Sequence, residues 1–348
     1  MKKKILKEDL FFSMTWDYLN IYLPTQHQDS PKTVKAYTDG LTVFRRYLTD
    51  HCRISIEHFC FRDLTYDFIL DYRTFLEGKE YKPNTVNHRL TVLSAYMRYA
   101  AFRKPELTQI YMDISEVPYV TVPSHIRDII EDEEALAMLL SAPGTSKIGI
   151  RDQVILVVLY DTAIRADELI RLKYTDVNIS CTEPYLRIHG KGDKERIVAL
   201  SEQTIPLLEQ YISLYHTDQS DKNMPFIYTV IKGRTDHMSE RNIERIVKKY
   251  GDMVRKEKPN VPTQIYPHML RRTRASGWYR DGVPIETIAV ILGHSDTKTT
   301  RKSYARPSIG MLRKEMAKGN PPELQNNGKE EMPLWTNDEE LARLCGIR

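Results

Sequence analysis

Apolar residues recur at helical spacing through the first third of the chain. They fall three and four positions apart, as in Val34, Tyr37, Leu41 and Phe44, which is the spacing of one buried helix face. Ser30-Pro31 and Lys82-Pro83 mark two helix starts, because serine caps the first N–H groups and proline is favoured in the first turn. We expect about four helices between residues 10 and 105.

The helical pattern weakens between residues 105 and 127. This stretch contains the extended, proline-punctuated segment Val117-Pro118-Tyr119-Val120-Thr121-Val122-Pro123, which is typical of a connection between domains. We therefore expect a helical domain at residues 1–105, an interdomain linker at 106–127 and a second domain at 128–317.

The second domain is expected to mix helices with a small amount of β-structure. Helical spacing returns near Asp132 and includes a buried helix over residues 152–160. Alternation then predicts a β-hairpin with strands at 185–189 and 195–200, because a glycine-containing turn separates them. From about residue 202 onward the pattern indicates helices again.

The last segment, residues 318–348, differs in composition. Residues 318–334 are rich in Gly, Pro, Asn, Glu and Lys and are expected to form a flexible connector. A short helix at 335–345 is expected to follow, since Thr336 to Glu339 fit a capping box. So short a helix is stable only when it packs against another surface, either on its own domain or on a neighbouring subunit.

Composition narrows the class of protein only slightly. The 348 residues are 41% hydrophobic and 28% charged, which is ordinary for a globular chain. The net charge of +4 is too small to indicate nucleic acid without clustering. The four cysteines show neither zinc-site pairing nor disulfide density, and no apolar run approaches the roughly 20 residues that span a bilayer. We expect a soluble, cytoplasmic protein with no membrane contact.

Basic residues cluster at several places where they could follow a DNA backbone. A solvated helix face is the ordinary explanation for such clusters. The candidates in the helical domain are Lys32, Lys35, Arg45, Arg46, His88, Arg89 and Arg98. Those in the second domain are Lys194, Arg196, Arg272 and Arg274, with Arg280 nearby.

Candidate catalytic groups lie along the second domain, and each alone has an ordinary explanation. Arg165 could pair with Glu168 on one helix face, Lys191 could be a solvated turn residue, and His294 could follow a helix C-cap at Gly293. His268 and Arg271 share a helix face. Tyr304 is one of 21 tyrosines. Together, however, they supply phosphate-binding arginines, proton-transfer groups and a nucleophile.

The order and spacing of these groups resemble the tyrosine recombinase, or phage integrase, family. The matching blocks are Thr162-Ala163-Ile164-Arg165-Ala166-Asp167-Glu168-Leu169, the hairpin Gly190-Lys191-Gly192-Asp193-Lys194-Glu195-Arg196, His268-Met269-Leu270-Arg271, Leu292-Gly293-His294-Ser295, and Tyr304. The resemblance covers residues 130–306, with a looser match at 10–105. It implies a two-domain, DNA-clamping architecture, mainly α-helical with a small β-sheet.

The resemblance also implies a role for each residue. Arg165 and Arg271 would bind the equatorial phosphate oxygens, Tyr304 would attack phosphorus, and Lys191 would protonate the leaving 5′-oxygen. His268 would accept the tyrosine proton or bond the phosphate, His294 would add a donor, and Glu168 would orient Arg165. The expected product is a 3′-phosphotyrosine. No metal or cofactor is expected, since the sequence lacks a P-loop and a clustered metal-ligand set.

The family's activity would make the protein a site-specific recombinase or integrase of a mobile element. Family members act as tetramers on two double-stranded DNA sites, through Holliday junctions, and the 335–345 helix would be the contact between subunits. One departure is that ten positions separate His294 from Tyr304, where nine are common. A type IB topoisomerase and a catalytically silent DNA-binding accessory protein or repressor are the alternatives.

Overall fold

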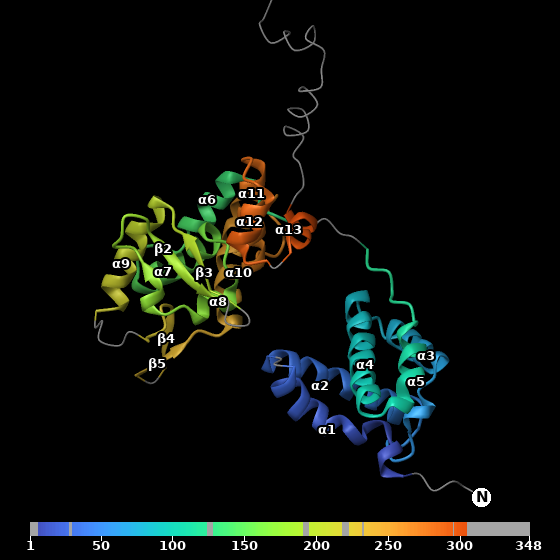
Figure 1. Ribbon diagram of the computed structural model, residues 1–348. Coiled ribbons are helices and arrows are strands. Elements are labelled where there is room, and N and C mark those ends of the chain that lie inside the picture. The colour runs from blue at the N-terminus through green and yellow to red at the C-terminus, as the bar shows by residue number, and fades with distance from the viewer. Residues whose placement is uncertain are drawn as a thin grey trace, which may run out of the picture. The chain divides into compact units, whose positions relative to one another are not determined.

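The computed structural model describes residues 6–27, 30–123, 128–190, 195–217, 223–231, 233–294 and 296–304. Of residues 231 and 302–304 it describes the backbone alone. The chain divides between Ile126 and Arg127 into two compact units (Figure 1). The expected class, mainly α-helix with a small β-sheet, is confirmed. No described helix is long and apolar enough to cross a membrane.

The regular elements described in the first unit are helices, apart from a single β-bridge between Leu10 and Cys60. Its long helices contact one another around α4. Their bounds are α1 Thr15–Asp17 continuing as η3 Tyr18–Gln26, α2 Pro31–Arg46 continuing as η4 Tyr47–His51, α3 Tyr66–Gly78, α4 Pro83–Arg103 and α5 Thr108–Ser115. Short turns of helix precede or join them at Lys7–Asp9, Phe11–Met14, Phe61–Asp63 and Pro105–Leu107.

The predicted helix starts of this unit are confirmed. The Ser30 hydroxyl accepts a hydrogen bond from the Thr33 N–H at 3.2 Å, so one of the unpaired N–H groups at the start of α2 is satisfied. Pro31 and Pro83 are the first residues of α2 and α4, where a missing N–H costs no hydrogen bond.

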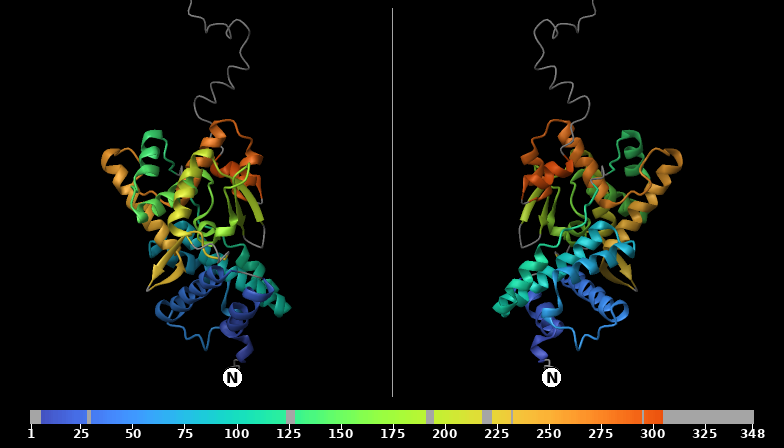
Figure 2. Two further views of the ribbon diagram at one scale, coloured as in Figure 1. Left: turned by 90° about the vertical axis from the view of Figure 1, so that its left-hand side faces the viewer. Right: turned by 90° about the vertical axis from the view of Figure 1, so that its right-hand side faces the viewer.

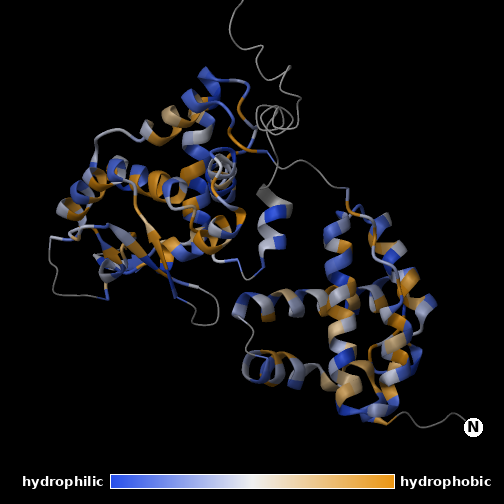
Figure 3. Ribbon diagram, turned by 45° about the horizontal axis from the view of Figure 1, so that its top comes forward, coloured by the Kyte–Doolittle hydropathy of each residue, from blue (hydrophilic) through white to orange (hydrophobic). Residues whose placement is uncertain are grey.

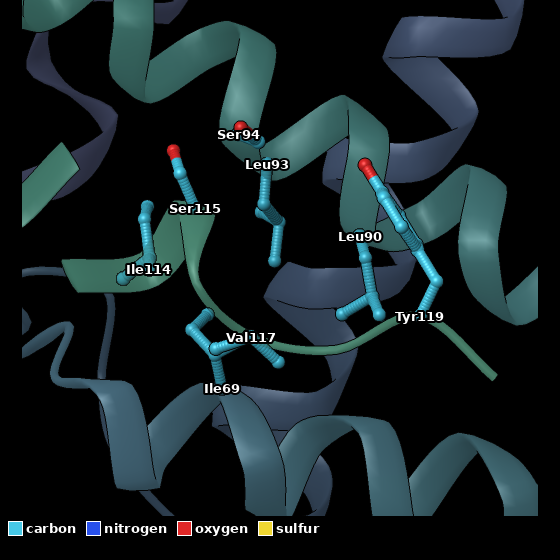
Figure 4. Close-up of a pocket in the computed structure, with 8 residues that line it drawn as sticks. All are labelled: Ile69, Leu90, Leu93, Ser94, Ile114, Ser115, Val117 and Tyr119. Atoms are coloured by element: carbon cyan, nitrogen blue, oxygen red, sulfur yellow. The ribbon is translucent and has the colours of Figure 1, made fainter. Parts of the chain in front are cut away.

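The expectation that residues 106–127 form only a linker is wrong over its first half. Thr108–Ser115 form α5, and Ile114 and Val117 are buried in the core of the first unit. Their apolar side chains pack against Leu90 and Leu93 of α4, where burial outweighs the helix-ending signals nearby. Figure 4 shows these side chains around a cavity of about 20 Å³, which is no larger than a water site.

The second unit places helices around a small sheet. Its helices are α6 Glu133–Ser141, α7 Lys147–Asp161, α8 Ala166–Arg171, α9 Ile205–Tyr215, α10 Glu240–Glu257, α11 Pro267–Arg280, α12 Ile285–Leu292 and α13 Thr297–Tyr304. Its strands are β1 Val177–Asn178, β2 Tyr185–His189, β3 Glu195–Ala199, β4 Tyr228–Ile231 and β5 Arg234–His237. Short 3₁₀ turns lie at Tyr174–Asp176 and Glu202–Thr204.

The β2–β3 hairpin is confirmed, and it belongs to an antiparallel sheet of order β1-β2-β3. Leu186 pairs with Val198 in register, and both face the core. A second hairpin, β4–β5, lies where only helices were expected after residue 202. Its β5 residues are all exposed, so the burial pattern that identifies a strand from sequence is missing there.

Helix α7 carries much of the second unit's core. Val154, Ile155, Leu156, Val158 and Leu159 are all buried, so several faces of the helix are covered by neighbours. Helices α11, α12 and α13 gather beside this core, and α12 also contacts β3 (Figure 2). Each unit has its own core of buried hydrophobic residues, and Figure 3 shows hydrophobic and hydrophilic residues interspersed along its helices.

Candidate active site

The start of helix α8 holds an arginine and a glutamate in one ion pair. Arg165 is the N-cap residue of α8, and its backbone N–H donates to Glu168 Oε2 at 2.8 Å. Its guanidinium Nη1 donates to Glu168 Oε1 at 2.9 Å. The Glu168 side chain is 2% exposed, whereas that of Arg165 is 41% exposed. The expected pair is therefore present, and it anchors a guanidinium that still faces solvent.

A second arginine binds the same carboxylate from the sheet. Arg196 of β3 donates from Nη1 to Glu168 Oε1 at 3.0 Å and from Nη2 to Oε2 at 2.8 Å. Its Nε donates to the carbonyl of Ile291 in α12 at 2.9 Å. A Cβ at Gly293, which has a φ of +64°, would come within 2.9 Å of Arg196 Nη1. One guanidinium therefore joins β3, α8 and the end of α12.

The charge state of Glu168 follows from these contacts. Burial raises the pKa of a carboxyl group, but hydrogen bonds from Arg196 and the Arg165 N–H, with the charges of both arginines, outweigh it and lower the pKa of Glu168 to about 2. The carboxylate is therefore ionised at neutral pH and is occupied by its two arginines. This arrangement suits a positioning residue.

Arg271 is buried in α11, with its guanidinium between two backbone carbonyls. Nη1 donates to the carbonyl of Ala163 at 2.7 Å, and Nη2 donates to that of Leu292 at 2.8 Å. Ala163 has a φ of +51°, which is uncommon for a residue with a Cβ. Ala163 lies two positions before Arg165. In this strained conformation its carbonyl accepts the hydrogen bond from Arg271. Strained residues of this kind cluster at functional sites.

His294 meets Arg271 directly after the left-handed turn at Gly293. Arg271 Nη2 lies 3.1 Å from His294 Nε2, and His294 Nδ1 lies 2.7 Å from the hydroxyl of Thr300 in α13. Burial, followed by the positive charges of Arg271 and Arg165, lowers the pKa of His294 to about 4. The imidazole is therefore neutral at neutral pH.

The other candidate catalytic residues are placed as follows. His268 is exposed in the first turn of α11, and its charge when protonated contributes to lowering the pKa of His294. Tyr304 is the last residue of α13, which contacts both α11 and α12. Lys191 lies outside the described residues, as do Lys194 and the predicted connector and helix at 318–348. Arg165, Arg271 and His294 are thus brought together around one point.

Three arginines predicted to contact DNA have partners within the protein. Arg196 is bound to Glu168 and Ile291, with a side chain only 12% exposed. Arg272 is 3% exposed, and its Nη2 donates to the Asp128 carbonyl and the Tyr266 hydroxyl. Arg274 pairs with Asp161 at 3.3 Å and lies over the Tyr160 and Trp278 rings. Their bonds satisfy carbonyl oxygens of other elements and the buried carboxylates of Glu168 and Asp161, which the sequence pattern does not show.

The basic residues of the first unit are more accessible. Lys32, Lys35, Arg45 and Arg46 are exposed along α2, although Lys35 pairs with Asp39 at 3.2 Å. On α4, His88 and Arg98 are exposed and Arg89 is partly buried. His88 and Arg89 line a cleft with residues of α2. Most of these side chains reach the surface of the first unit.

Sequence reasoning missed Thr300 and the internal partners of Arg196. Thr300 bonds His294 and is fully buried, although it is one of several threonines in a polar helix. Arg196 was assigned to DNA. Its spacing from Glu168 in the sequence gives no sign of their contact, because pairs across separate elements depend on the tertiary fold. Among the described residues, no group of three or more His, Cys, Asp or Glu side chains could hold a metal ion.

Family models match both units. A model of the phage integrase family matches residues 130–309. A model of the phage integrase SAM-like domain matches residues 10–108.

Relatives of known name align with most of the chain. Tyrosine recombinase XerC of Staphylococcus carnosus is 26% identical over 292 residues, covering 84% of this chain and 92% of the relative. Tyrosine recombinase XerD of Staphylococcus aureus is 28% identical over 287 residues, covering 82% and 91%.

Solved structures share the fold at lower identity. The Tn1549 transposon integrase with transposon right end DNA has a TM-score of 0.67 at 13% identity, covering 89% of this chain and 98% of that one. A lambda integrase tetramer bound to a Holliday junction has a TM-score of 0.57 at 16% identity, covering 85% and 78%. With the two family models and the Xer relatives, these findings show that the chain belongs to the phage integrase family, the tyrosine-type site-specific recombinases.

Proposed function

We propose that the protein cleaves and rejoins double-stranded DNA through a 3′-phosphotyrosyl intermediate on Tyr304. The observation that supports this most strongly is the meeting of Arg165, Arg271 and His294. Arg271 contacts His294 at 3.1 Å, and Arg165 is close enough to lower the pKa of the same imidazole. Two guanidinium groups beside a neutral imidazole suit a phosphodiester whose equatorial oxygens gain charge in the transition state.

The two arginines are held in different ways. Glu168 fixes one edge of the Arg165 guanidinium and leaves the side chain 41% exposed, so that its remaining N–H groups can meet a phosphate oxygen. Arg271 is fixed by the carbonyls of Ala163 and Leu292. A guanidinium already oriented by backbone acceptors loses little freedom when a phosphate arrives.

Proton transfer is assigned to the remaining groups. A histidine is suited to accept the tyrosine proton near neutral pH, and we assign that step to the exposed His268. His294, neutral because of its lowered pKa, donates a hydrogen bond to the phosphate. Lys191 protonates the leaving 5′-oxygen. The free 5′-hydroxyl then attacks the phosphotyrosine, so the energy of the broken ester is conserved and no ATP is consumed.

Arg196 takes a positioning role in place of the DNA contact expected from the sequence. It binds Glu168 and the Ile291 carbonyl, so it holds the carboxylate that orients Arg165 and the end of α12 that precedes His294. Strand β3, which carries Arg196, begins at Glu195, four positions after Lys191 in the sequence. The sheet, α8 and α12 are thereby kept in one arrangement around the site.

DNA contact is assigned mainly to the first unit. Exposed basic side chains on α2 and α4 suit the phosphate backbone. Because α5 packs in that unit, we extend the DNA-binding domain through α5 and start the catalytic domain at about residue 128.

Tetramer formation on two DNA sites, through a Holliday junction, is part of the same proposal. The lambda integrase tetramer on a Holliday junction shares this fold, which supports the assembly. We assign the subunit contact to the predicted 335–345 helix. The Tn1549 transposon integrase also shares the fold. This likeness supports the proposal that the protein recombines the DNA of a mobile element.

A plasmid assay tests the proposed function. A DNA site is first selected from a random-sequence pool by binding to the purified protein, and two copies are placed in direct repeat on a supercoiled plasmid. We expect excision of the segment between them. Relaxation without excision would instead favour a topoisomerase-like enzyme, and binding without any strand cleavage would favour a catalytically silent DNA-binding protein.

A further inference from the structure

Helix α13 buries one hydroxyl against the candidate site. Thr300 is 0% exposed, whereas Lys298, Thr299 and Arg301 around it are exposed. Its Oγ1 lies 2.7 Å from Nδ1 of His294. A buried hydroxyl is costly unless it is hydrogen-bonded, so this contact accounts for a polar residue on the buried side of the helix.

The partners of His294 define which ring nitrogen carries the proton. An arginine can only donate hydrogen bonds, so His294 Nε2 accepts from Arg271 Nη2 at 3.1 Å. In a neutral imidazole the proton is then on Nδ1, and the Thr300 hydroxyl accepts it.

Donation to a DNA phosphate from Nε2 requires the opposite tautomer. The proton must then lie on Nε2, and Nδ1 must accept a hydrogen bond. A threonine hydroxyl can serve both states, because by rotating it either accepts from Nδ1–H or donates to Nδ1. A valine at this position could serve neither.

We propose that Thr300 is a positioning residue for strand cleavage, whose hydroxyl supports His294 in both tautomers and joins that imidazole to the helix that ends at Tyr304. This inference rests on the proposed function. Thr300 precedes Tyr304 by about one helical turn within α13. Docking of the helix and orientation of the imidazole therefore depend on one contact.

Three variants separate the hydroxyl from the methyl group of Thr300. Thr300→Val keeps the shape and removes the hydrogen bond, Thr300→Ser keeps the hydroxyl, and Thr299→Val makes the same change at the exposed neighbour. The probe is a nicked duplex carrying the site selected from the random pool, and the readout is the single-turnover rate of covalent adduct formation. We expect Thr300→Val to slow the rate by about tenfold, the effect of one lost hydrogen bond.

Rescue by serine is the decisive comparison. Thr300→Ser and Thr299→Val are expected to stay within about twofold of the wild type, and all variants should bind the duplex equally. A Thr300→Val rate equal to that of wild type would overturn the inference. So would a Thr300→Ser rate lower than that of Thr300→Val, since packing of the methyl group would then be the role of Thr300.

A spectroscopic readout needs no DNA. In ¹⁵N NMR of the histidine side chains, wild-type His294 should show a protonated Nδ1 and an unprotonated Nε2, and Thr300→Val should lose this preference while Thr300→Ser keeps it. Identical His294 spectra in wild type and Thr300→Val would contradict the inference. If even the wild type formed no adduct, the proposed function would fail, and these spectra would still test the Thr300 contact.

Discussion

Glu168 is the residue on which the charges of the site converge. Its buried carboxylate accepts hydrogen bonds from the Arg165 N–H, from the Arg165 side chain and twice from Arg196. A buried carboxylate is favourable only when its charge is matched in this way, and removing one partner leaves an unpaired charge. The residue therefore matters to stability as well as to the orientation of Arg165.

The lowered pKa of Glu168 predicts a pH-dependent stability. The pKa of Glu168 is about 2 in the folded protein, below its ordinary value of 4.5. The ionised carboxylate therefore stabilises the fold fully above about pH 5, and this stabilisation is lost as the pH falls toward 2. Its size is about 3 kcal/mol. Relative to wild type, Glu168→Gln should lower the free energy of unfolding by about that amount at neutral pH, and the difference should vanish near the folded pKa.

Urea unfolding across this pH range measures the effect. Glu209→Gln, an exposed change on α9, is the control and should follow the wild type. A difference between wild type and Glu168→Gln that stays constant with pH would show that the carboxylate charge is not what stabilises the fold.

The sequence identifies the charged residues of the site better than it identifies the groups to which they are hydrogen-bonded. The Arg165–Glu168 pair follows from a spacing of three positions on a helix start, and it is present at 2.9 Å. Arg196 and Arg272 show no comparable signal, because the acceptors that bury them lie on other elements. A basic residue in a motif looks the same whether its partner is a phosphate or a backbone carbonyl.

Among elements, β3, α8 and α12 are joined through the Arg196 guanidinium. The contact brings together residues 28 and 95 positions apart in sequence. The close approach of Gly293 to this side chain fixes where α12 can end. The element arrangement around the site therefore depends on a charged group, in addition to apolar packing.

Arg196→Met should separate a positioning role from DNA contact. We expect the free energy of unfolding to fall by about 3 kcal/mol, because Glu168 loses a buried partner, while the salt dependence of duplex binding stays unchanged. Arg187→Met, at an exposed position of β2, is the matched control and should change stability by less than about 0.5 kcal/mol. If Arg196→Met instead reduced the slope of log affinity against log salt concentration by about one and left stability unchanged, Arg196 would be assigned to DNA contact after all.

The exposed face of α2 is expected to contribute directly to DNA affinity. Arg45→Ala and Arg46→Ala should each weaken binding and reduce the slope of log affinity against log salt by about one. Arg62→Ala, an exposed arginine outside α2 and α4, should leave the slope unchanged. Fluorescence anisotropy with a labelled duplex gives the slopes, and equal values for all three variants would refute the assignment.

Element boundaries show where sequence reasoning works. The starts of α2 and α4 are marked by local chemistry, Ser30-Pro31 and Pro83, and are predicted correctly. Helix α5 and the β4–β5 hairpin are missed for different reasons. Prolines nearby mask the buried face of α5, whereas β5 is exposed along its length, so its sequence carries no alternation.

At the scale of the whole molecule, the two units match two models of one family. The first offers exposed basic side chains, and the second holds Arg165, Arg271 and His294 around one point. The fold class and both units are foreseeable from sequence, because helical periodicity and ordered motifs are local signals. The proposed chemistry depends on Tyr304 at the end of α13.

Covalent trapping is the most direct test of the central claim, that Tyr304 attacks DNA. Wild type, Tyr304→Phe and Tyr279→Phe, a tyrosine of α11 outside the proposed site, are incubated with a nicked duplex carrying the selected site and separated under denaturing conditions. We predict an adduct with wild type and Tyr279→Phe, none with Tyr304→Phe, and a phosphonucleotide on the Tyr304 peptide by mass spectrometry. An adduct that persists in Tyr304→Phe, or maps to another residue, would contradict the account.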